Sequence, residues 1–173
     1  MPSSSATEVW TDGACIGNPG AGGWGAVILS AGTRRELSSG FLRTTNNRME
    51  LMGPIRALQA LEPRSMVVLR TDSLYVVKGI EKGWAKSWRA RNWMRTRTEK
   101  AINADLWALL LDVCEQHQVR LEWVKGHAGH RENERCDALA TAAARRADRE
   151  IDSGYENVLR ADREGHGSLF PGT

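Results

Sequence analysis

Four acidic side chains stand out for where they fall relative to the predicted strands and helices. Asp12 closes the first predicted strand, and Asp72 follows the fourth. Glu50 lies inside the first long predicted helix, and Asp137 lies about one turn into the last one. Neighbouring strands of an α/β sheet present their end residues at one edge. We therefore expect the two aspartates to meet there, with the two helices supplying the other carboxylates.

The chemistry open to such a group is that of divalent cations. Four carboxylates at one place repel one another by several kcal/mol at protein-like dielectric. Oxygen ligands select Mg²⁺ or Mn²⁺ over zinc. Two such ions about 4 Å apart can hydrolyse a phosphodiester, because one activates the attacking water and the other stabilises the leaving oxygen. A single aspartate of this kind is more often a cap or a surface residue, so the prediction depends on the set.

The elements that must position these acids follow from hydrophobic periodicity, capping residues and Gly or Pro breaks. Strands are predicted at Thr7–Asp12, Trp24–Ser30, Arg34–Phe41, Met66–Thr71 and Val119–Val124, with CIGNPGAGG as the first loop. Helices are predicted from Thr44 or Thr45 to about Leu61, from Asp72 or Ser73 through Ile80, from Asn103 or Asp105 to about His117, and from Glu132 to Arg146. The apolar face of the first helix is Met49, Met52, Ile55 and Leu58, and further expected core residues are Trp10, Trp107 and Trp123. This order predicts an α/β fold with a mixed five-stranded sheet, in which three antiparallel strands are extended by parallel strands, flanked by helices.

Length and composition limit the class of protein. The chain has 173 residues, enough for one domain with a real core. Its 41% hydrophobic and 26% charged residues are typical of a soluble globular protein rather than a disordered one. No apolar run is long enough to cross a bilayer, no secretory signal is evident, and three cysteines are too few for a disulfide framework. We therefore expect a cytoplasmic monomer without a membrane partner.

Two regions depart from this average. Lys78–Lys100, expected to be a helix or helical hairpin, carries eight basic and two acidic side chains together with Trp84, Trp88 and Trp93. Cations beside aromatic rings suit a polyanion such as nucleic acid, whereas a solvated helix face would not need the rings. From Asp148 onward the periodicity stops. We therefore expect one domain at residues 1–147, with a basic protrusion near residues 80–100, and a loosely structured tail at residues 148–173.

Four blocks of the sequence occur in a recognisable order and spacing. They are TDGACIGNPGAGGWGAV around Asp12, TTNNRMELM around Glu50, TDSLYV around Asp72, and EWVKGHAGHRENERCDALA around Asp137. Together they resemble type 1 ribonuclease H, and most of all its bacterial single-domain form. The resemblance implies a ribonuclease H-like fold. It also implies an endoribonuclease that hydrolyses the RNA strand of RNA–DNA hybrids, leaving 5′-phosphate and 3′-hydroxyl ends with little sequence preference.

The resemblance further implies a role for each residue of the catalytic site. The four acids match metal-binding catalytic positions, which take two Mg²⁺ ions in the substrate complex, with Mn²⁺ as a substitute. His127, between Gly126 and Gly129, matches a mobile catalytic histidine that assists proton transfer or product departure. The matching residues are Asp12, Glu50, Asp72, His127 and Asp137.

Contacts to the two nucleic-acid strands are implied in the same way. The residues that match a lining of the hybrid's minor groove are Cys15, Asn18, Asn46 and Asn47. Arg43 and Thr45 resemble parts of a pocket for a DNA phosphate. The protrusion that grips the DNA strand corresponds to Trp84, Lys86, Trp88, Arg89 and Arg91. One departure is Leu74, which stands where the family often has a glutamine, so we expect weaker contact with a base edge.

Three alternatives remain to be weighed. A catalytically silent hybrid-binding module would keep the fold without the chemistry, but all four acids are present. A related nuclease, such as a Holliday-junction resolvase or an integrase core, would lack the GNPG loop and the tryptophan-rich basic segment. A zinc site at His127, His130 and Cys136 is disfavoured because a fourth soft ligand is missing.

Overall fold

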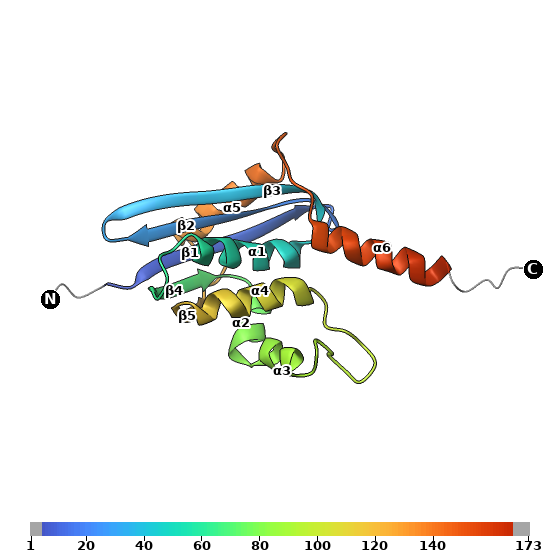
Figure 1. The fold of residues 1–173 in the computed structure, drawn as a ribbon. Coiled ribbons are helices and arrows are strands. Elements are labelled where there is room, and N and C mark those ends of the chain that lie inside the picture. Colours follow the sequence, from blue (N-terminus) through green and yellow to red (C-terminus); the bar gives the residue numbers. More distant parts are fainter. Residues whose placement is uncertain (1–4, 168–173) are drawn as a thin grey trace, which may run out of the picture.

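The computed structural model describes residues 5–167, and at its centre lies the predicted mixed five-stranded sheet (Figure 1). The strand order is β3-β2-β1-β4-β5. β1 (Thr7–Ile16), β2 (Gly20–Ser30) and β3 (Thr33–Thr44) form an antiparallel meander. β4 (Met66–Thr71) pairs parallel with β1, and β5 (Gln118–Trp123) pairs parallel with β4. The predicted fold class is therefore confirmed.

The β1–β2 hairpin is longer than the sequence predicted. We expected CIGNPGAGG to be a loop, yet Cys15 pairs with Gly22 and Ile16 pairs with Ala21. Only residues 17–19 separate the two strands. A glycine-rich segment can stay in a sheet when other elements pack directly on its backbone, and helices lie on both faces of this hairpin. Asp12 consequently lies inside β1 rather than at its end.

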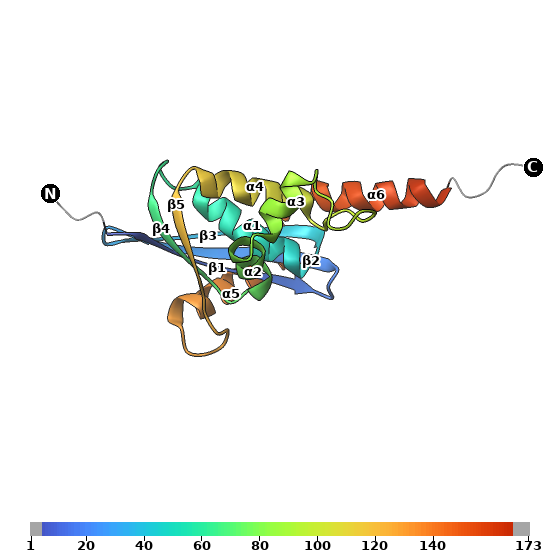
Figure 2. The same ribbon diagram turned by 90° about the horizontal axis from the view of Figure 1, so that it is seen from below.

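Helices cover both faces of the sheet (Figure 2). α1 (Asn46–Gln59) and α4 (Ala104–Glu115) lie on one side, and α5 (Arg131–Ala143) packs on the other. Thr45 begins α1 as its N-cap, accepting a hydrogen bond from Arg48 N at 3.3 Å. Burying a large apolar side chain stabilises the fold by about 2 kcal/mol. The predicted apolar face of α1 is confirmed, because it buries Met49, Met52, Ile55 and Leu58.

The basic segment Lys78–Lys100 contains one complete short helix and a loop. α2 (Leu74–Glu81) ends within the first few residues of this basic segment, and α3 (Trp84–Ala90) follows. Residues 91–103 then run without a helix to the start of α4. The prediction of a helix is therefore confirmed for α3, and the rest of the protrusion is irregular.

The tryptophans expected in the core differ in burial. Trp107 is fully buried, whereas Trp10 is half-buried and Trp123 is 46% exposed. The prediction for Trp123 is wrong because β5 is an edge strand and this residue is its last. Its indole Nε1 donates instead to the carbonyl oxygen of Asp72 at 3.0 Å, which ties the end of β5 to the residue that follows β4.

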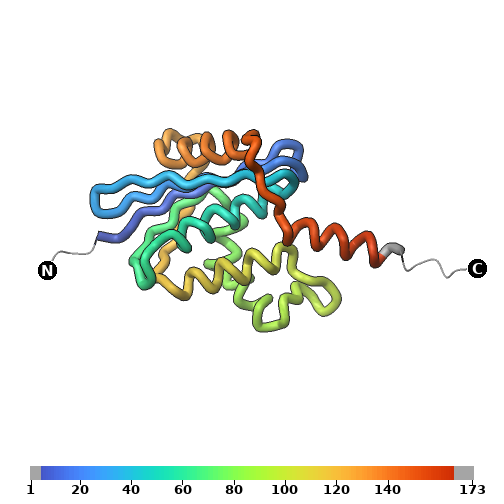
Figure 3. Tube along the Cα trace, turned by 45° about the horizontal axis from the view of Figure 1, so that its top comes forward, coloured from blue at the N-terminus to red at the C-terminus, as the bar shows by residue number. Residues whose placement is uncertain are grey.

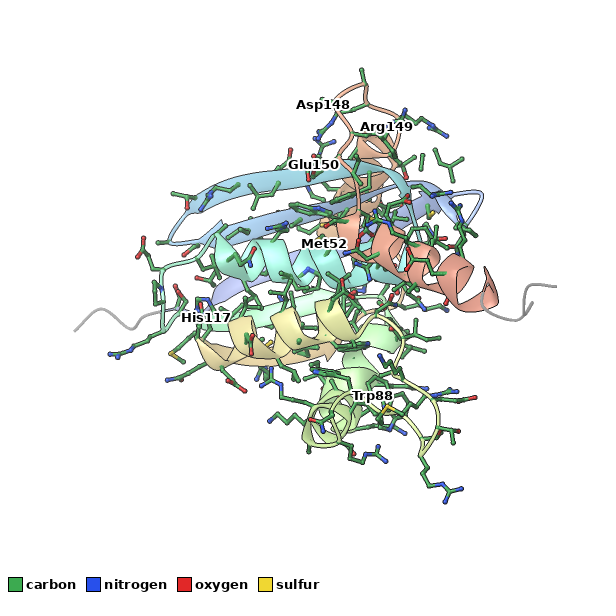
Figure 4. All side chains as sticks on the ribbon, turned by 45° about the vertical axis from the view of Figure 1, so that its right-hand side comes forward. Met52, Trp88, His117, Asp148, Arg149 and Glu150 are labelled. Atoms are coloured by element: carbon green, nitrogen blue, oxygen red, sulfur yellow. The ribbon has the colours of Figure 1, made fainter. Side chains whose placement is uncertain are left out.

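The prediction of a loosely structured tail is wrong for residues 150–167. Glu150 joins β3 through backbone hydrogen bonds to Gly40 and Leu42, each of 2.8 Å. Figure 4 shows it with its two preceding residues beside β3. A helix, α6 (Ser153–Gly167), follows directly.

A buried ion pair anchors this segment to the domain. Asp152 is 3% exposed and accepts hydrogen bonds from Arg48 Nε at 2.7 Å and from Thr44 Oγ1 at 2.6 Å. Arg48 is itself buried and also donates to Asp105. Because a buried guanidinium without a carboxylate partner is strongly destabilising, the start of α6 is a structural part of the domain. The helix then projects away from the body (Figures 1 and 3).

Within residues 5–167, no helix combines the length and the apolar character needed to cross a membrane. The ends of the predicted domain and of the predicted tail, residues 1–4 and 168–173, lie outside the described residues.

Candidate active site

Asp12 and Asp72 lie side by side because β1 and β4 are parallel neighbours. The last pair of the two strands joins Thr11 to Thr71, so the next residue of each segment is an aspartate. Asp12 is 9% exposed, and its Oδ1 accepts a hydrogen bond from Gly13 N at 2.8 Å. Two acids from distant parts of the chain thus share one edge of the parallel pair.

Glu50 reaches the same edge through close packing of α1 on β1. A Cβ atom on Gly13 would lie 2.6 Å from Glu50 N, so glycine is required for the helix to come this near. Asn46 Nδ2 donates to Glu50 Oε1 at 2.8 Å, and Ser73 Oγ donates to Oε2. The sequence indicated Ser73 only as a helix cap; its contact with Glu50 spans 23 residues and has no local pattern.

Asp137 comes from α5 on the opposite face of the sheet. Gly25 pairs with Asp12 across the β1–β2 ladder, and a Cβ atom on it would lie 2.5 Å from Cys136 O. Cys136 Sγ donates to Trp10 O at 3.2 Å, which further fixes α5 on β1. The next residue, Asp137, is half-buried, and its charge acts on Asp12. It lies nearly two turns into α5, which begins at Arg131, one residue before the predicted start.

These four carboxylates, here called the acidic cluster, are Asp12, Glu50, Asp72 and Asp137. Burial first and the charge of Asp72 second raise the pKa of Asp12 to about 8. The charges of Asp137 and Glu50 add to the rise. Burial also raises the pKa of Glu50, although its two side-chain hydrogen bonds oppose this. A bound cation would stabilise the ionised form of these partly buried carboxylates, because it offsets their excess negative charge.

The donor set of the acidic cluster fits a hard divalent cation. All of its ligands are carboxylate oxygens, which Mg²⁺ and Mn²⁺ prefer. Among residues 5–167, no three His, Cys, Asp or Glu side chains are already arranged as a metal-binding group. In this structure the carboxylates of the cluster are neighbours that repel one another electrostatically.

His127 lies in the loop between β5 and α5, next to the cluster. Its backbone φ is 54°, in the left-handed region that few non-glycine residues adopt, and its side chain is exposed. A Cβ atom on Gly126 would lie 2.6 Å from Asp72 Oδ2, so the loop backs directly onto that carboxylate. Of the three side chains weighed for a zinc site, Cys136 is buried, whereas His127 and His130 are exposed.

The residues predicted to line a minor groove lie at the start of α1 and in the β1–β2 hairpin. Asn18 Oδ1 accepts a hydrogen bond from Asn46 N at 3.1 Å, which ties the hairpin turn to the helix that carries Glu50. Cys15 Sγ donates to the carbonyl oxygen of Thr44 at 3.5 Å. A cavity of about 910 Å³ opens here and is shared with α6. The predicted contact residues that line it are Asn18, Thr45, Asn46 and Asn47.

Arg43, predicted to hold a DNA phosphate, is already paired with an acid of α6. Its Nε donates to Glu156 Oε1 at 2.9 Å, and its Nη2 donates to Oε2 at 2.6 Å. The side chains of Arg43 and Glu156 are 45% and 30% exposed. Glu156 is not among the predicted site residues, because it lies in the segment that the sequence predicts to be a loosely structured tail.

Part of the protrusion remains open to solvent. Trp84 is 42% exposed, and Lys82 Nζ lies 5.9 Å from its ring centroid. Lys86 and Arg91 are exposed as well. These side chains are available for contact with a polyanion.

Two other predicted contact residues face the body of the domain instead. Trp88, labelled in Figure 4, packs against Trp107 with ring centroids 6.1 Å apart. Arg89 donates to Asp112 at 2.7 Å and to Glu115 at 3.1 Å, both on α4. These residues attach the protrusion to α4.

Comparison with known sequences gives a consistent result. The sequence model of the RNase H family matches residues 4–145. Ribonuclease H of Desulforamulus reducens is 59% identical over 144 residues, which cover 83% of this chain and 91% of the relative. Ribonuclease H of Escherichia coli O9:H4 is 52% identical over 149 residues, covering 86% of this chain and 95% of the relative.

Solved structures agree with the sequence relatives. LC9-RNase H1, described as a type 1 RNase H with the type 2 active-site motif, superimposes with a TM-score of 0.72 at 36% identity and covers 88% of this chain and 79% of its own. LC11-RNase H1, solved in complex with an RNA/DNA hybrid, shares the fold at a TM-score of 0.59 and 22% identity, over 80% of this chain and 96% of its own. The chain therefore belongs to the ribonuclease H family, as a type 1 enzyme of the bacterial form.

Proposed function

We propose that this chain is a divalent-metal-dependent endoribonuclease that cuts the RNA strand of RNA–DNA hybrids and leaves 5′-phosphate and 3′-hydroxyl ends. One observation carries the proposal: four carboxylates from separate elements share one edge of the sheet, where their burial and mutual charge leave Asp12 hard to ionise. The structural relative LC11-RNase H1 was solved with an RNA/DNA hybrid, which supports the substrate class.

The acidic cluster would hold two Mg²⁺ ions, with Mn²⁺ as a substitute. When bound, such ions supply an activated water and stabilise charge on the leaving oxygen. The protein's own contribution is orientation. Asn46 and Ser73 each hold one oxygen of Glu50, and the N–H of Gly13 holds one oxygen of Asp12. Ligands fixed in this way keep the scissile phosphate in line for attack.

We propose that His127 transfers the proton that the reaction requires. Hydrolysis adds water to phosphorus and breaks the P–O3′ bond, so the departing 3′-oxygen must take up a proton. The His127 imidazole is exposed, and the preceding residue, Gly126, backs onto Asp72. The imidazole can donate that proton or accept one from water, because it carries both a donor and an acceptor nitrogen. The same side chain would assist departure of the 5′-phosphate product.

Separate contacts to the two strands would select a hybrid. Asn46, one of the asparagines of the cavity, donates to Glu50. Short polar groups here could meet the 2′-hydroxyls of an A-form-like minor groove, and Glu50 itself would contact one of them. On the DNA strand, Arg43 and Thr45 would hold a phosphate, and Trp84 would lie against a sugar. Leu74 is 47% exposed and has no hydrogen-bonding group, so a base contact there would be weak.

We also propose that the protein acts as a monomer in the cytoplasm. Three cysteines are unpaired, as expected in a reducing compartment: Cys15, Cys114 and Cys136. Light scattering during gel filtration, with and without hybrid, would measure the oligomeric state.

Cleavage of an end-labelled RNA–DNA hybrid tests the main proposal. With Mg²⁺ we expect cuts in the RNA strand alone, their loss with EDTA, and their return with Mn²⁺. Duplex RNA and duplex DNA of the same sequence are the substrate controls, and Asp12→Asn is the protein control. Hybrid binding without cleavage at any metal concentration would favour the silent module, and cleavage of branched DNA would favour a resolvase-like or integrase-like enzyme.

A further inference from the structure

The helix α6 brings a carboxylate to the guanidinium that is proposed to hold a DNA phosphate. Glu156 lies in the first turn of α6, and both of its oxygens accept hydrogen bonds from Arg43. A carboxylate and a phosphate offer a guanidinium the same fork of two acceptors. Glu156 therefore occupies the donors of Arg43 that a phosphate would need.

This pair lies where a nucleic-acid backbone would arrive. Tyr155 and Val158, on either side of Glu156 in the chain, line the same 910 Å³ cavity as Asn18 and Thr45. Figures 1 and 3 show α6 projecting from the end of the body that carries the β1–β2 turn. The acid is thus next to the predicted contact surface and not on a remote part of the protein.

The helix itself cannot swing away easily, because Asp152 is buried and bonded to Arg48 at its base. A change of partner must therefore be a movement of the Glu156 side chain. Arg43 lowers the pKa of Glu156 most, and the charges of Arg163 and Arg160 on α6 contribute. Arg160 lies four residues after Glu156, a spacing at which an acid and a base pair favourably on a helix.

We infer that Glu156 is an internal competitor of the DNA strand for Arg43, and that it thereby sets the affinity for the hybrid. The inference rests on the proposed function, since it takes Arg43 to be a phosphate contact. In the free protein Arg43 pairs with Glu156. In the complex Arg43 pairs with a phosphate, and Glu156 turns to Arg160. Arg43 and Glu156 each have a charged partner in both states, so the competition weakens binding without preventing it.

The substitution Glu156→Gln tests this inference, because it removes the competing charge and keeps the size of the side chain. We expect KM for the hybrid to fall about two- to fivefold, the range of an exposed ion pair. The value of kcat should stay constant, because Arg43 does not touch the reacting phosphate. The matched control is Glu164→Gln, which removes an exposed acid further along α6 and should change KM less. The gain of Glu156→Gln over the control should shrink as salt is raised.

Arg43→Ala separates failure of the inference from failure of the proposed function. Alone it should raise KM, and adding Glu156→Gln to it should change nothing further. If Arg43→Ala raises KM while Glu156→Gln behaves like Glu164→Gln, the inference is overturned and the phosphate contact stands. If Arg43→Ala leaves KM unchanged in an enzyme that still cuts hybrids, the phosphate contact and the inference are overturned together. Both α6 variants should unfold at the wild-type temperature, since neither side chain belongs to the core.

Discussion

The acidic cluster and the cationic surface beside it handle charge in opposite ways. In the cluster, Asp12 and Glu50 accept hydrogen bonds from neutral donors, namely a backbone N–H, an amide and a hydroxyl. On the cationic surface, formed by Arg43 and the protrusion, arginines carry acidic partners of their own. These pairs are Arg43 with Glu156, Arg89 with Asp112 and Glu115, and Arg95 with Glu99.

The difference follows from what each region is proposed to bind. A buried acid that already had a basic partner would attract a metal ion less, whereas an acid without one remains unfavourable until a cation arrives. An exposed arginine can exchange one acceptor for another at small change in free energy, because exposed ion pairs contribute only about 0–1 kcal/mol. Changes in the cluster should therefore act strongly on kcat, and changes on the cationic surface should act modestly on KM.

Asp72→Asn should have the largest effect of any single change. It removes one charge from the cluster at nearly constant shape, so we expect kcat to fall about a thousandfold or more, while hybrid binding persists. Single-turnover cleavage and fluorescence anisotropy would measure the two quantities. Asp148→Asn, at an exposed aspartate after α5, is the control and should cut like the wild type. Normal turnover by Asp72→Asn would place the catalytic centre elsewhere.

His127→Ala should slow cleavage about a hundredfold without abolishing it. His127 is proposed to transfer a proton and is not one of the proposed metal ligands. Water can therefore still transfer the proton when the imidazole is removed. The control is His130→Ala, because His130 is also exposed but its ring lies against Trp10, with ring centroids 5.9 Å apart. A loss as deep as that of Asp72→Asn would contradict the auxiliary role.

The neighbourhood of the acidic cluster could be predicted because its members lie in strongly patterned segments. A short run of apolar, β-favouring residues locates the strand before Asp72, and the three- and four-residue spacing from Met49 to Leu58 locates the helix that carries Glu50. Parallel pairing then brings the strand-end acids together. The glycine-rich hairpin was misjudged as a loop for a related reason, since glycine adds no side chain to the alternation and its backbone pairing depends on the neighbouring strand.

The cationic surface was less predictable because its partners are remote in sequence. Arg43 and Glu156 are 113 residues apart, and Arg48 and Asp152 are 104 apart. The tail has only a short apolar spacing, at Ile151, Tyr155 and Val158, which favours a helix but does not say where that helix docks. An arginine's acidic partner leaves no trace in hydrophobic patterning. The exposed Trp84 and the inward Trp88 likewise stand four residues apart in the same basic segment, and only the packing of Trp88 on α4 separates them.

Ser73→Ala should lower kcat about tenfold, the scale seen when a group that orients a metal ligand is removed. It deletes the hydroxyl that donates to Glu50, which should leave that carboxylate free to turn. The same hydroxyl caps α2 through Val76 N at 3.3 Å, so the variant should also lose about 1 kcal/mol of stability. Ser73→Thr keeps the hydroxyl and should restore both properties. A variant that loses stability but keeps its kcat would show that Ser73 is a cap and nothing more.

Trp84→Ala should have the smallest effect on activity in this series, and it should change KM rather than kcat. Removing one ring from a nucleic-acid contact should raise KM about fivefold or more, with kcat and thermal stability unchanged, because the ring is exposed and carries no core contacts. Trp88→Ala is the matched variant within the same helix, and it should lower the free energy of unfolding by about 2 kcal/mol, because Trp88 packs on the buried Trp107. The opposite outcome, with Trp84 needed for stability and Trp88 for KM, would remove the protrusion's exposed face from the interface. The expected outcome would mean that the two tryptophans have separate roles. Trp88 would attach the protrusion to the domain, and Trp84 would contact the DNA strand.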